Sequence, residues 1–255
     1  MIVEDQEKTH DHFAGLTVWD EKIQGKDIPG TTRVPIQELS AYFDGKFSGL
    51  VGLDLGSGSG RSTKELTEKL PGSRVHAIDL SLDGLRNTKA TPDRYQASAL
   101  DIPFAGETFD FISVCGVFTN LVSDDASQAI GLRMNAVKEL HRTIKPGGCV
   151  VISDFGAEHK IDKYAVNYKR HALITGEIGT IAVLKQGVGF IGKSDEEVAA
   201  LKGTDSVIRY AHHYFPRELQ ALLKSGGFKT NTITIGLTKT PSGIPIENIV
   251  VLASK

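Results

Sequence analysis

Short apolar runs alternate with helical patterns from about residue 50 to the end of the chain. The runs that predict strands are residues 50–55, 75–78, 109–117 and 149–155. Between them, helices are predicted over residues 61–70 and from the acidic N-cap 123–125 to the glycine pair at 147–148. Alternating strands and helices are typical of βαβ units. The pattern therefore predicts an α/β fold with a mostly parallel sheet and helices on both faces.

The rhythm breaks after residue 155 and resumes near residue 216. Residues 156–205 are mixed in polarity and rich in glycine, which predicts an insertion over the mouth of the site. A helix beginning at Pro216 and a terminal hairpin of residues 232–237 and 246–253 complete the pattern. The predicted organisation is an N-terminal cap (1–48), a core (49–155), a lid or acceptor-binding insertion (156–214) and the C-terminal part of the core (215–255).

Charge and composition narrow the classes of partner. The chain has 255 residues, with 29 Lys and Arg against 31 Asp and Glu, so no global positive field favours nucleic acid. No stretch approaches the roughly 20 apolar residues of a membrane span, and we expect no membrane contact and a cytoplasmic protein. Both cysteines, Cys115 and Cys149, lie in apolar strand-like runs, which predicts reduced core thiols.

A glycine-rich loop joins the first predicted strand to the first helix. Its sequence, residues 53–60, reads Leu-Asp-Leu-Gly-Ser-Gly-Ser-Gly. Glycines at such a turn let the backbone approach a ligand closely. A dinucleotide site would normally carry a third glycine where this chain has Arg61, and no Gly-Lys-Ser/Thr follows as in a P-loop. Taken alone, the loop therefore does not decide between the nucleotide cofactors that such loops bind.

The loop resembles the first motif of class I S-adenosylmethionine (SAM)-dependent methyltransferases, and the chain is similar to the methyltransferase-11 type. The resemblance implies a Rossmann-like sheet, with SAM as cofactor and S-adenosylhomocysteine as product. It implies that Asp54 orients the loop and interacts with the SAM ammonium group. Asp79, at the end of the second strand, would accept hydrogen bonds from both ribose hydroxyls.

The resemblance continues over roughly residues 50–155. Residues 98–104 are similar to the family's adenine-side loop, although Ser98 replaces its usual aspartate and, as a neutral acceptor, should bind adenine more weakly. Residues 115–118 match the strand end that opens towards the methionine part of SAM, and residues 140–142 and 145–148 resemble the segment before the fifth strand. The expected cofactor-binding residues are Arg33, Asp54, Gly56, Ser57, Gly58, Gly60, Asp79, Leu80, Ser98, Ala99, Leu100, Cys115 and Gly116.

Two of these expectations have alternatives. Arg33 is a candidate for the SAM carboxylate, because a guanidinium matches it bidentately, but an arginine on the surface of a coil fits the sequence equally well. Cys115 is disfavoured as a nucleophile, because apolar neighbours raise the pKa of a thiol and methyl transfer needs no covalent enzyme intermediate.

Catalytic and acceptor-binding residues are sought in the insertion and after the fourth strand. His212 and His213 would point to opposite faces of an extended segment, so at most one faces the cleft as a general base; a packed or hydrogen-bonded histidine is the alternative. The adjacent pair does not predict a metal site. The expected acceptor-binding residues are Phe118, Asn120, Tyr164, Tyr168 and His171.

The sequence thus predicts SN2 transfer of the SAM methyl group to an O, N, C or S nucleophile of a small molecule held under the lid. A tRNA or RNA acceptor is one alternative, since residues 209–214 are similar to a short run in tRNA wobble-uridine methyltransferases, although the near-neutral charge argues against it. A NAD-dependent oxidoreductase or a non-catalytic SAM-binding protein is another. The identity of the acceptor and the oligomeric state stay open.

Overall fold

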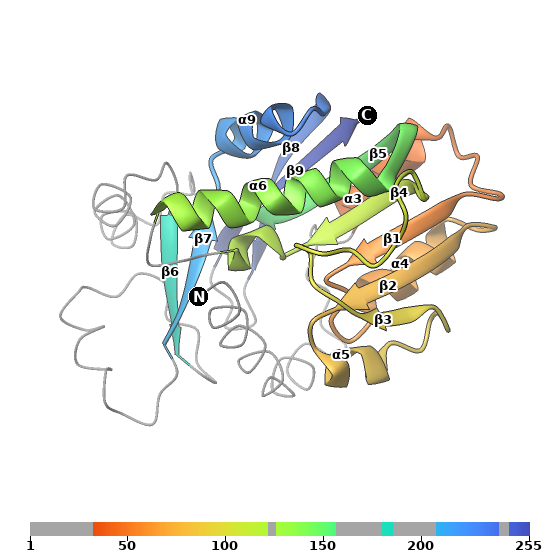
Figure 1. Ribbon diagram of the computed structural model, residues 1–255, viewed down its shortest axis with the longest axis horizontal. Coiled ribbons are helices and arrows are strands. Elements are labelled where there is room, and N and C mark those ends of the chain that lie inside the picture. Colours follow the sequence, from red (N-terminus) through yellow and green to blue (C-terminus); the bar gives the residue numbers. More distant parts are fainter. Residues whose placement is uncertain (1–32, 122–125, 157–179, 186–207, 240–244) are drawn as a thin grey trace.

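The protein is built on a seven-stranded sheet in the order β3-β2-β1-β4-β5-β9-β8. The computed structural model describes residues 33–121, 126–156, 180–185, 208–239 and 245–255 (Figure 1). Strands β1 to β5 run parallel, β9 is antiparallel to β5, and β8 is antiparallel to β9. Their bounds are β1 Val51–Leu55, β2 Arg74–Asp79, β3 Arg94–Gln96, β4 Phe109–Cys115, β5 Ile144–Phe155, β8 Lys229–Lys239 and β9 Pro245–Ser254. The predicted α/β class and the terminal hairpin are confirmed.

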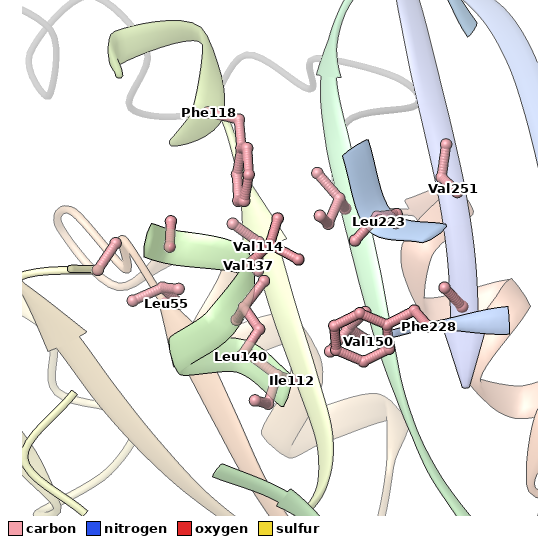
Figure 2. Packing of buried hydrophobic residues seen from close by; sticks show 14 of the residues in the cluster. Leu55, Ile112, Val114, Phe118, Val137, Leu140, Val150, Leu223, Phe228 and Val251 are labelled. Atoms are coloured by element: carbon pink, nitrogen blue, oxygen red, sulfur yellow. The ribbon is translucent and has the colours of Figure 1, made fainter. Parts of the chain in front are cut away.

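Helices cover both faces of the sheet (Figure 1). Helices α3 (Arg33–Tyr42) and α4 (Arg61–Lys69) pack with one set of strand side chains, including Phe111 and Val151. Helices α6 (Ala126–Thr143) and α9 (Pro216–Ser225) pack with the opposite set, and Figure 2 shows Val137 and Leu140 of α6 against Ile112 and Val114. The central strands β1, β4 and β5 are mostly buried on both sides, which is why they read as continuous apolar runs.

The parallel strands end along one edge of the sheet. Leu55, the last residue of β1, is in register with Ile78 of β2 and Val114 of β4. The residues that follow these strands therefore come together, as ligand-binding loops do at the carboxyl edge of open α/β sheets.

The predicted boundary between the helix α6 and the next strand is wrong. The Lys-Pro-Gly-Gly segment 145–148 was expected to separate them, but β5 begins at Ile144, which pairs with Phe109 before a register shift. Gly147 N and Gly148 O bond with Lys255 at the chain end. A turn-forming sequence is thus drawn into the sheet by partners distant in sequence. Helix α5 (Leu82–Asn87), the 3₁₀ turn η1 (Phe118–Asn120) and β3 were not predicted individually.

The predicted insertion leaves and returns at the end of β5. Gly156 forms a parallel bridge with Tyr214, and Tyr214 N donates to Phe155 O at 2.9 Å. Within the insertion, β6 (Thr180–Lys185) and β7 (Ile208–His213) form a separate antiparallel pair. Both ends of the insertion therefore lie at the carboxyl edge of the sheet.

Candidate functional site

The glycine loop takes a backbone path that requires glycine. Gly56, Gly58 and Gly60 have φ values of 76°, 52° and 85°, in the left-handed region that L-residues avoid. A Cβ atom on Gly60 would lie 2.7 Å from Cα of Thr88, whereas one on Gly58 would meet nothing within 4 Å. The loop is therefore packed on the protein at Gly60 and open at Gly58, where a ligand can approach.

Four backbone amides of this loop are already bonded within the protein. Gly56 N and Ser57 N both donate to Ile78 O, at 2.8 and 3.1 Å, and Gly60 N donates to Ser57 O. Gly58 N donates to Oδ2 of Asp79 at 2.8 Å. A phosphate-binding loop instead points such amides at its ligand. The geometry consequently disfavours a pyrophosphate or a nucleotide triphosphate at this loop.

Buried acceptor oxygens, in contrast, lack partners here. Asp54 is fully buried, and its Oδ2 accepts from the hydroxyls of Ser62 and Thr63 at 2.7 and 2.6 Å. Its Oδ1, together with Oγ of Ser57, is buried without a hydrogen-bond partner. A buried oxygen without a partner is costly, so these two atoms call for a ligand that supplies donors.

The charge state of Asp54 depends on what occupies the site. Burial, and to a smaller extent the nearby Asp79 carboxylate, raise the pKa of Asp54 to about 6, against the opposing effect of the Thr63 and Ser62 hydroxyls. A cation beside Oδ1 would favour the ionised form. The two carboxylates beneath one loop therefore suit a positively charged ligand.

Asp79 lies at the end of β2, as expected. Besides Gly58 N, it accepts from Ser81 N through Oδ1 at 2.8 Å. A carboxylate has about four lone-pair positions. Leu80 follows it, half-buried, and its carbonyl accepts from the side-chain amide of Gln96. Asp79 thus joins the glycine loop to the start of α5.

The adenine-side loop lies next to this corner, after β3. Ser98 Oγ accepts from Leu100 N at 3.1 Å, and Ser98 bridges to Asp101, so these residues form a closed turn. Ala99 is buried and Leu100 is half-buried. The turn leads into residues 102–104, which contact α6. Ser98, Ala99 and Leu100 are therefore placed beside Asp79 by backbone geometry.

The end of β4 supplies the third side of the site. Gly116 N donates to Ser153 O at 2.9 Å, and Gly116 O accepts from Nδ2 of Asn120 at 2.6 Å. That bond fixes the amide orientation and leaves Oδ1 of Asn120 buried without a partner. Cys115 is half-buried, and burial raises the pKa of its thiol to about 12, which opposes a nucleophilic role. Phe118 is fully buried in the core (Figure 2).

A buried carboxylate that the sequence did not single out anchors the turn after β4. Asp154, 1% exposed, accepts from Thr119 N at 2.9 Å and from Phe155 N at 2.8 Å. Burial raises its pKa to about 7, although these backbone amides and His212 oppose the shift. An aspartate inside an otherwise apolar strand was the available signal, because such a charge is rarely buried without a role.

His212 belongs to a buried polar cluster at the end of β7. Its Nε2 lies 2.7 Å from Oε1 of Glu218 on α9, its ring packs edge-on against Tyr214, and its carbonyl accepts from the Thr119 hydroxyl. Arg133 of α6 lies 3.7 Å from the same Glu218 oxygen. His212 is fully buried, which matches the packed, hydrogen-bonded alternative. Only the backbone of His213 is described, where it pairs with Thr180.

Arg33 is exposed at the first residue of α3. The other end of this helix lies at the start of β5, where Tyr42 Oη donates to Gly147 O. In the middle of the helix, Glu38 accepts a hydrogen bond from the hydroxyl of Thr234 in β8. Thr234 is in register with Val250 of β9, which is in register with Ser153 near the carboxyl end of β5. The helix therefore begins on the side of the carboxyl edge, where Arg33 can approach the site.

Some expected residues and ligands fall outside these observations. Tyr164, Tyr168 and His171 lie outside the described residues, as do residues 1–32 of the predicted cap. Within the described ranges, no three His, Cys, Asp or Glu side chains are arranged to hold a metal ion. No helix in the described part of the chain is long and apolar enough to cross a membrane.

Comparison with known proteins identifies a family over the core. Residues 53–152 match the methyltransferase domain family. The chain is also similar to demethylmenaquinone methyltransferase of Corynebacterium urealyticum, with 36% identity over 122 residues, which are 48% of this chain and 48% of that protein. The match thus spans about half the length of that relative. The family match over residues 53–152 includes the glycine loop and the neighbouring strand ends.

Solved structures share the fold over most of the chain. A SAM-dependent methyltransferase of Methanosarcina mazei has a TM-score of 0.64 and 22% identity, covering 86% of this chain and 96% of its own. The 1,6-didemethyltoxoflavin-N1-methyltransferase of Burkholderia thailandensis, solved with its substrate and S-adenosylhomocysteine, has a TM-score of 0.60 and 17% identity, covering 100% and 88%. At 17–22% identity, this similarity shows the fold alone. The roles of individual residues therefore have to be argued from the geometry of the site.

Proposed function

We propose that the chain is a class I SAM-dependent methyltransferase, and that it transfers the methyl group of SAM to an O, N, C or S nucleophile of a small molecule. The observation that carries the proposal is the polarity of the glycine loop. Four of its amides are bonded within the protein, while Asp54 Oδ1 and Ser57 Oγ are buried acceptors without partners. An ammonium group and ribose hydroxyls supply the donors that these oxygens need, and a pyrophosphate does not.

In this proposal, residues at the ends of different strands hold different parts of the cofactor. Asp54 and Ser57 would hold the ammonium end, with Arg33 reaching the carboxylate of the same methionine part. Asp79 would accept from the ribose hydroxyls, and the turn of Ser98 to Leu100 would face adenine. Cys115 and Gly116 would line the path between these ends. Asp54 and Asp79 give the site the negative charge that a sulfonium and an ammonium group require.

The bound cofactor supplies the electrophilic methyl group, and the protein aligns the acceptor. Asn120 lies at the end of β4 with its Oδ1 fixed as an acceptor, where it can orient an N–H or O–H group of the acceptor. The insertion, both ends of which join at the carboxyl edge, would exclude water. Alignment and desolvation can carry most of the catalysis when the leaving group is already cationic.

A general base is a secondary feature of this proposal. His212 is fully buried on Glu218 and would act on an acceptor only after this contact changes, so its role in our proposal is to hold β7 against α9. An acceptor that is already ionised, such as a carboxylate or a thiolate, needs no base. His213 stays a candidate general base, and Tyr164, Tyr168 and His171 stay candidates for the acceptor pocket.

Cell location follows from the same reading. Both cysteines of the chain, Cys115 and Cys149, are free thiols, as in proteins of a reducing compartment. We therefore place the enzyme in the cytoplasm, with a small organic acceptor as its partner.

Calorimetric titration tests the cofactor assignment. We expect SAM and S-adenosylhomocysteine to bind and NAD not to bind. Asp79→Asn keeps one acceptor oxygen for two ribose hydroxyls and should weaken S-adenosylhomocysteine binding about tenfold. Asp83→Asn is the matched control, because Asp83 is an exposed acid of the adjacent helix that pairs with Arg86.

The contrary results are clear. If the wild-type protein binds neither SAM nor its product, the proposed function is wrong. If it binds them and Asp79→Asn binds as tightly as Asp83→Asn, the ribose assignment is wrong. Native mass spectrometry of the protein as purified would then identify any acceptor that accompanies the cofactor.

A further inference from the structure

Two side chains of α6 hold the backbone of the adenine-side loop, although the loop lies more than 35 positions earlier in the sequence. Arg142 donates from Nη1 to Phe104 O at 2.7 Å and from Nη2 to Ile102 O at 2.8 Å. Glu139 accepts through Oε2 from Ile102 N at 2.9 Å. Both backbone polar groups of Ile102 are therefore bonded to this pair, which fixes the orientation of the peptide units on either side of it.

The pair is itself rigid. Nε and Nη2 of Arg142 donate to the two carboxylate oxygens of Glu139 at 2.8 and 2.7 Å, one turn apart on the same helix. These contacts lower the pKa of Glu139 and raise that of Arg142, so both stay ionised. A bidentate guanidinium–carboxylate pair has one preferred plane. The donors left over from this pairing are therefore aimed at the loop in a fixed direction.

Two backbone hydrogen bonds attach the segment that follows the loop to the C-terminal end of α6. Glu107 N donates to Arg142 O at 2.9 Å, and Thr108 N donates to Thr143 O at 2.8 Å. The loop is thus held from Ile102 to Thr108, and the turn of Ser98 to Leu100 projects from this fixed base. The turn itself is closed by the Ser98 Oγ contact and by the bridge to Asp101.

We propose that Glu139 and Arg142 are positioning residues for the adenine end of the cofactor, acting through the 98–104 loop. The inference rests on the proposed function. We call the Glu139–Arg142 pair the clamp. Because Ser98 is a neutral acceptor, adenine recognition in this chain depends more on the backbone groups that the clamp positions than on a charged side chain. In this proposal, Glu139 and Arg142 act through the loop and make no contact with the cofactor themselves.

The inference is tested by comparing two ligands that differ only at adenine. S-inosylhomocysteine replaces the exocyclic amine of S-adenosylhomocysteine with an oxygen, so the ratio of the two dissociation constants measures adenine recognition. We expect Arg142→Lys, which retains the charge but not the fork, to weaken S-adenosylhomocysteine about tenfold and to leave the inosine analogue nearly unchanged. Glu139→Gln should give a smaller loss in the same direction, because it retains an acceptor for Ile102 N.

Arg74→Lys is the matched control. Arg74 forms a bidentate pair with Asp93, through Nε and Nη2 at 2.8 and 2.9 Å, that holds no part of the 98–104 loop. It should leave the ratio unchanged, and thermal unfolding of each variant shows whether the fold is intact. If Arg142→Lys weakens both ligands equally, or neither, the positioning role is overturned while the proposed function stands. If the wild-type protein binds neither ligand, the proposed function fails first.

Discussion

The two halves of the site are built by different means. On the cofactor side, glycines with left-handed φ, a closed turn and bonded amides form a backbone cradle between β1, β2 and β3. On the insertion side, buried ionisable side chains hold the structure, with Asp154, His212, Glu218 and Arg133 joining β5, β7, α9 and α6. The first kind of site is sensitive to added side-chain volume, and the second to protonation. Substitutions and pH should therefore separate the two halves.

The largest effect is expected from the pH dependence of stability through Asp154. The pKa of Asp154 is raised to about 7 in the folded protein. The protonated carboxyl therefore contributes fully to stability at a pH below the pKa of Asp154 in the unfolded chain, and this contribution is lost as the pH rises through about 7. Between pH 3 and 8, this group should remove about 4 kcal/mol of unfolding free energy, most of it between pH 4 and 7. Asp154→Asn mimics the protonated carboxyl and should abolish that part of the pH dependence.

Urea unfolding of both proteins at pH 4, 5.5 and 7 measures this term as a difference. The stability of the wild-type protein relative to Asp154→Asn should fall as the pH rises. A difference that is constant across this range would mean that Asp154 is not buried as described.

A slightly smaller effect is expected on the cofactor side from one added methyl group. Gly60→Ala strains the left-handed backbone and places Cβ against the backbone of Thr88, which should cost about 3 kcal/mol of unfolding free energy. Gly58→Ala has the same kind of strain in open space and should cost about 1 kcal/mol.

In ligand binding the order of the two variants should reverse, with Gly58→Ala losing more affinity than Gly60→Ala. Gly58→Ala fills the space by which a ligand approaches, so its loss of S-adenosylhomocysteine affinity should exceed what its stability suggests. Thermal unfolding and calorimetry on the same samples make the comparison. Equal stability of the two variants would contradict the packing assigned to Gly60.

His212 tests whether the insertion side is structural or chemical. His212→Gln loses the contact with Glu218 and the ring packing on Tyr214, and should cost about 2 kcal/mol of stability while S-adenosylhomocysteine binding is unchanged. Chemical denaturation and calorimetry measure the two quantities. A variant that keeps full stability but loses methyl transfer to a co-purified acceptor would instead identify His212 as the general base.

The smallest effect is expected on SAM affinity, through a buried acid on the cofactor side that resembles the buried acid on the insertion side. Asp54 is a buried acid on the cofactor side, with a pKa near 6 that a bound cation would lower. SAM affinity should therefore weaken about tenfold from pH 7 to pH 5, because a protonated Asp54 must lose its proton on binding. Asp54→Asn should remove this pH dependence. An affinity of the wild-type protein that does not change with pH would contradict the contact with the ammonium group.

The same contrast explains what could be predicted from the sequence. The glycine loop, Asp79 and the turn at Ser98 follow directly after strands, so local patterning was enough to locate them. The clamp of Glu139 and Arg142 and the Asp154 anchor join residues 35 or more positions apart, and no local pattern reveals such partners. The strand boundary at Ile144 was missed for the same reason, since its pairing with Phe109 outweighs the turn propensity of Pro146 and Gly147.

The most direct test of the central claim is a crystal structure with S-adenosylhomocysteine. Our account predicts the ribose hydroxyls within hydrogen-bond distance of Asp79, the ammonium group beside Asp54 Oδ1, and adenine against the turn of Ser98 to Leu100. Density for the ligand away from the glycine loop, or a ribose that does not contact Asp79, would contradict it.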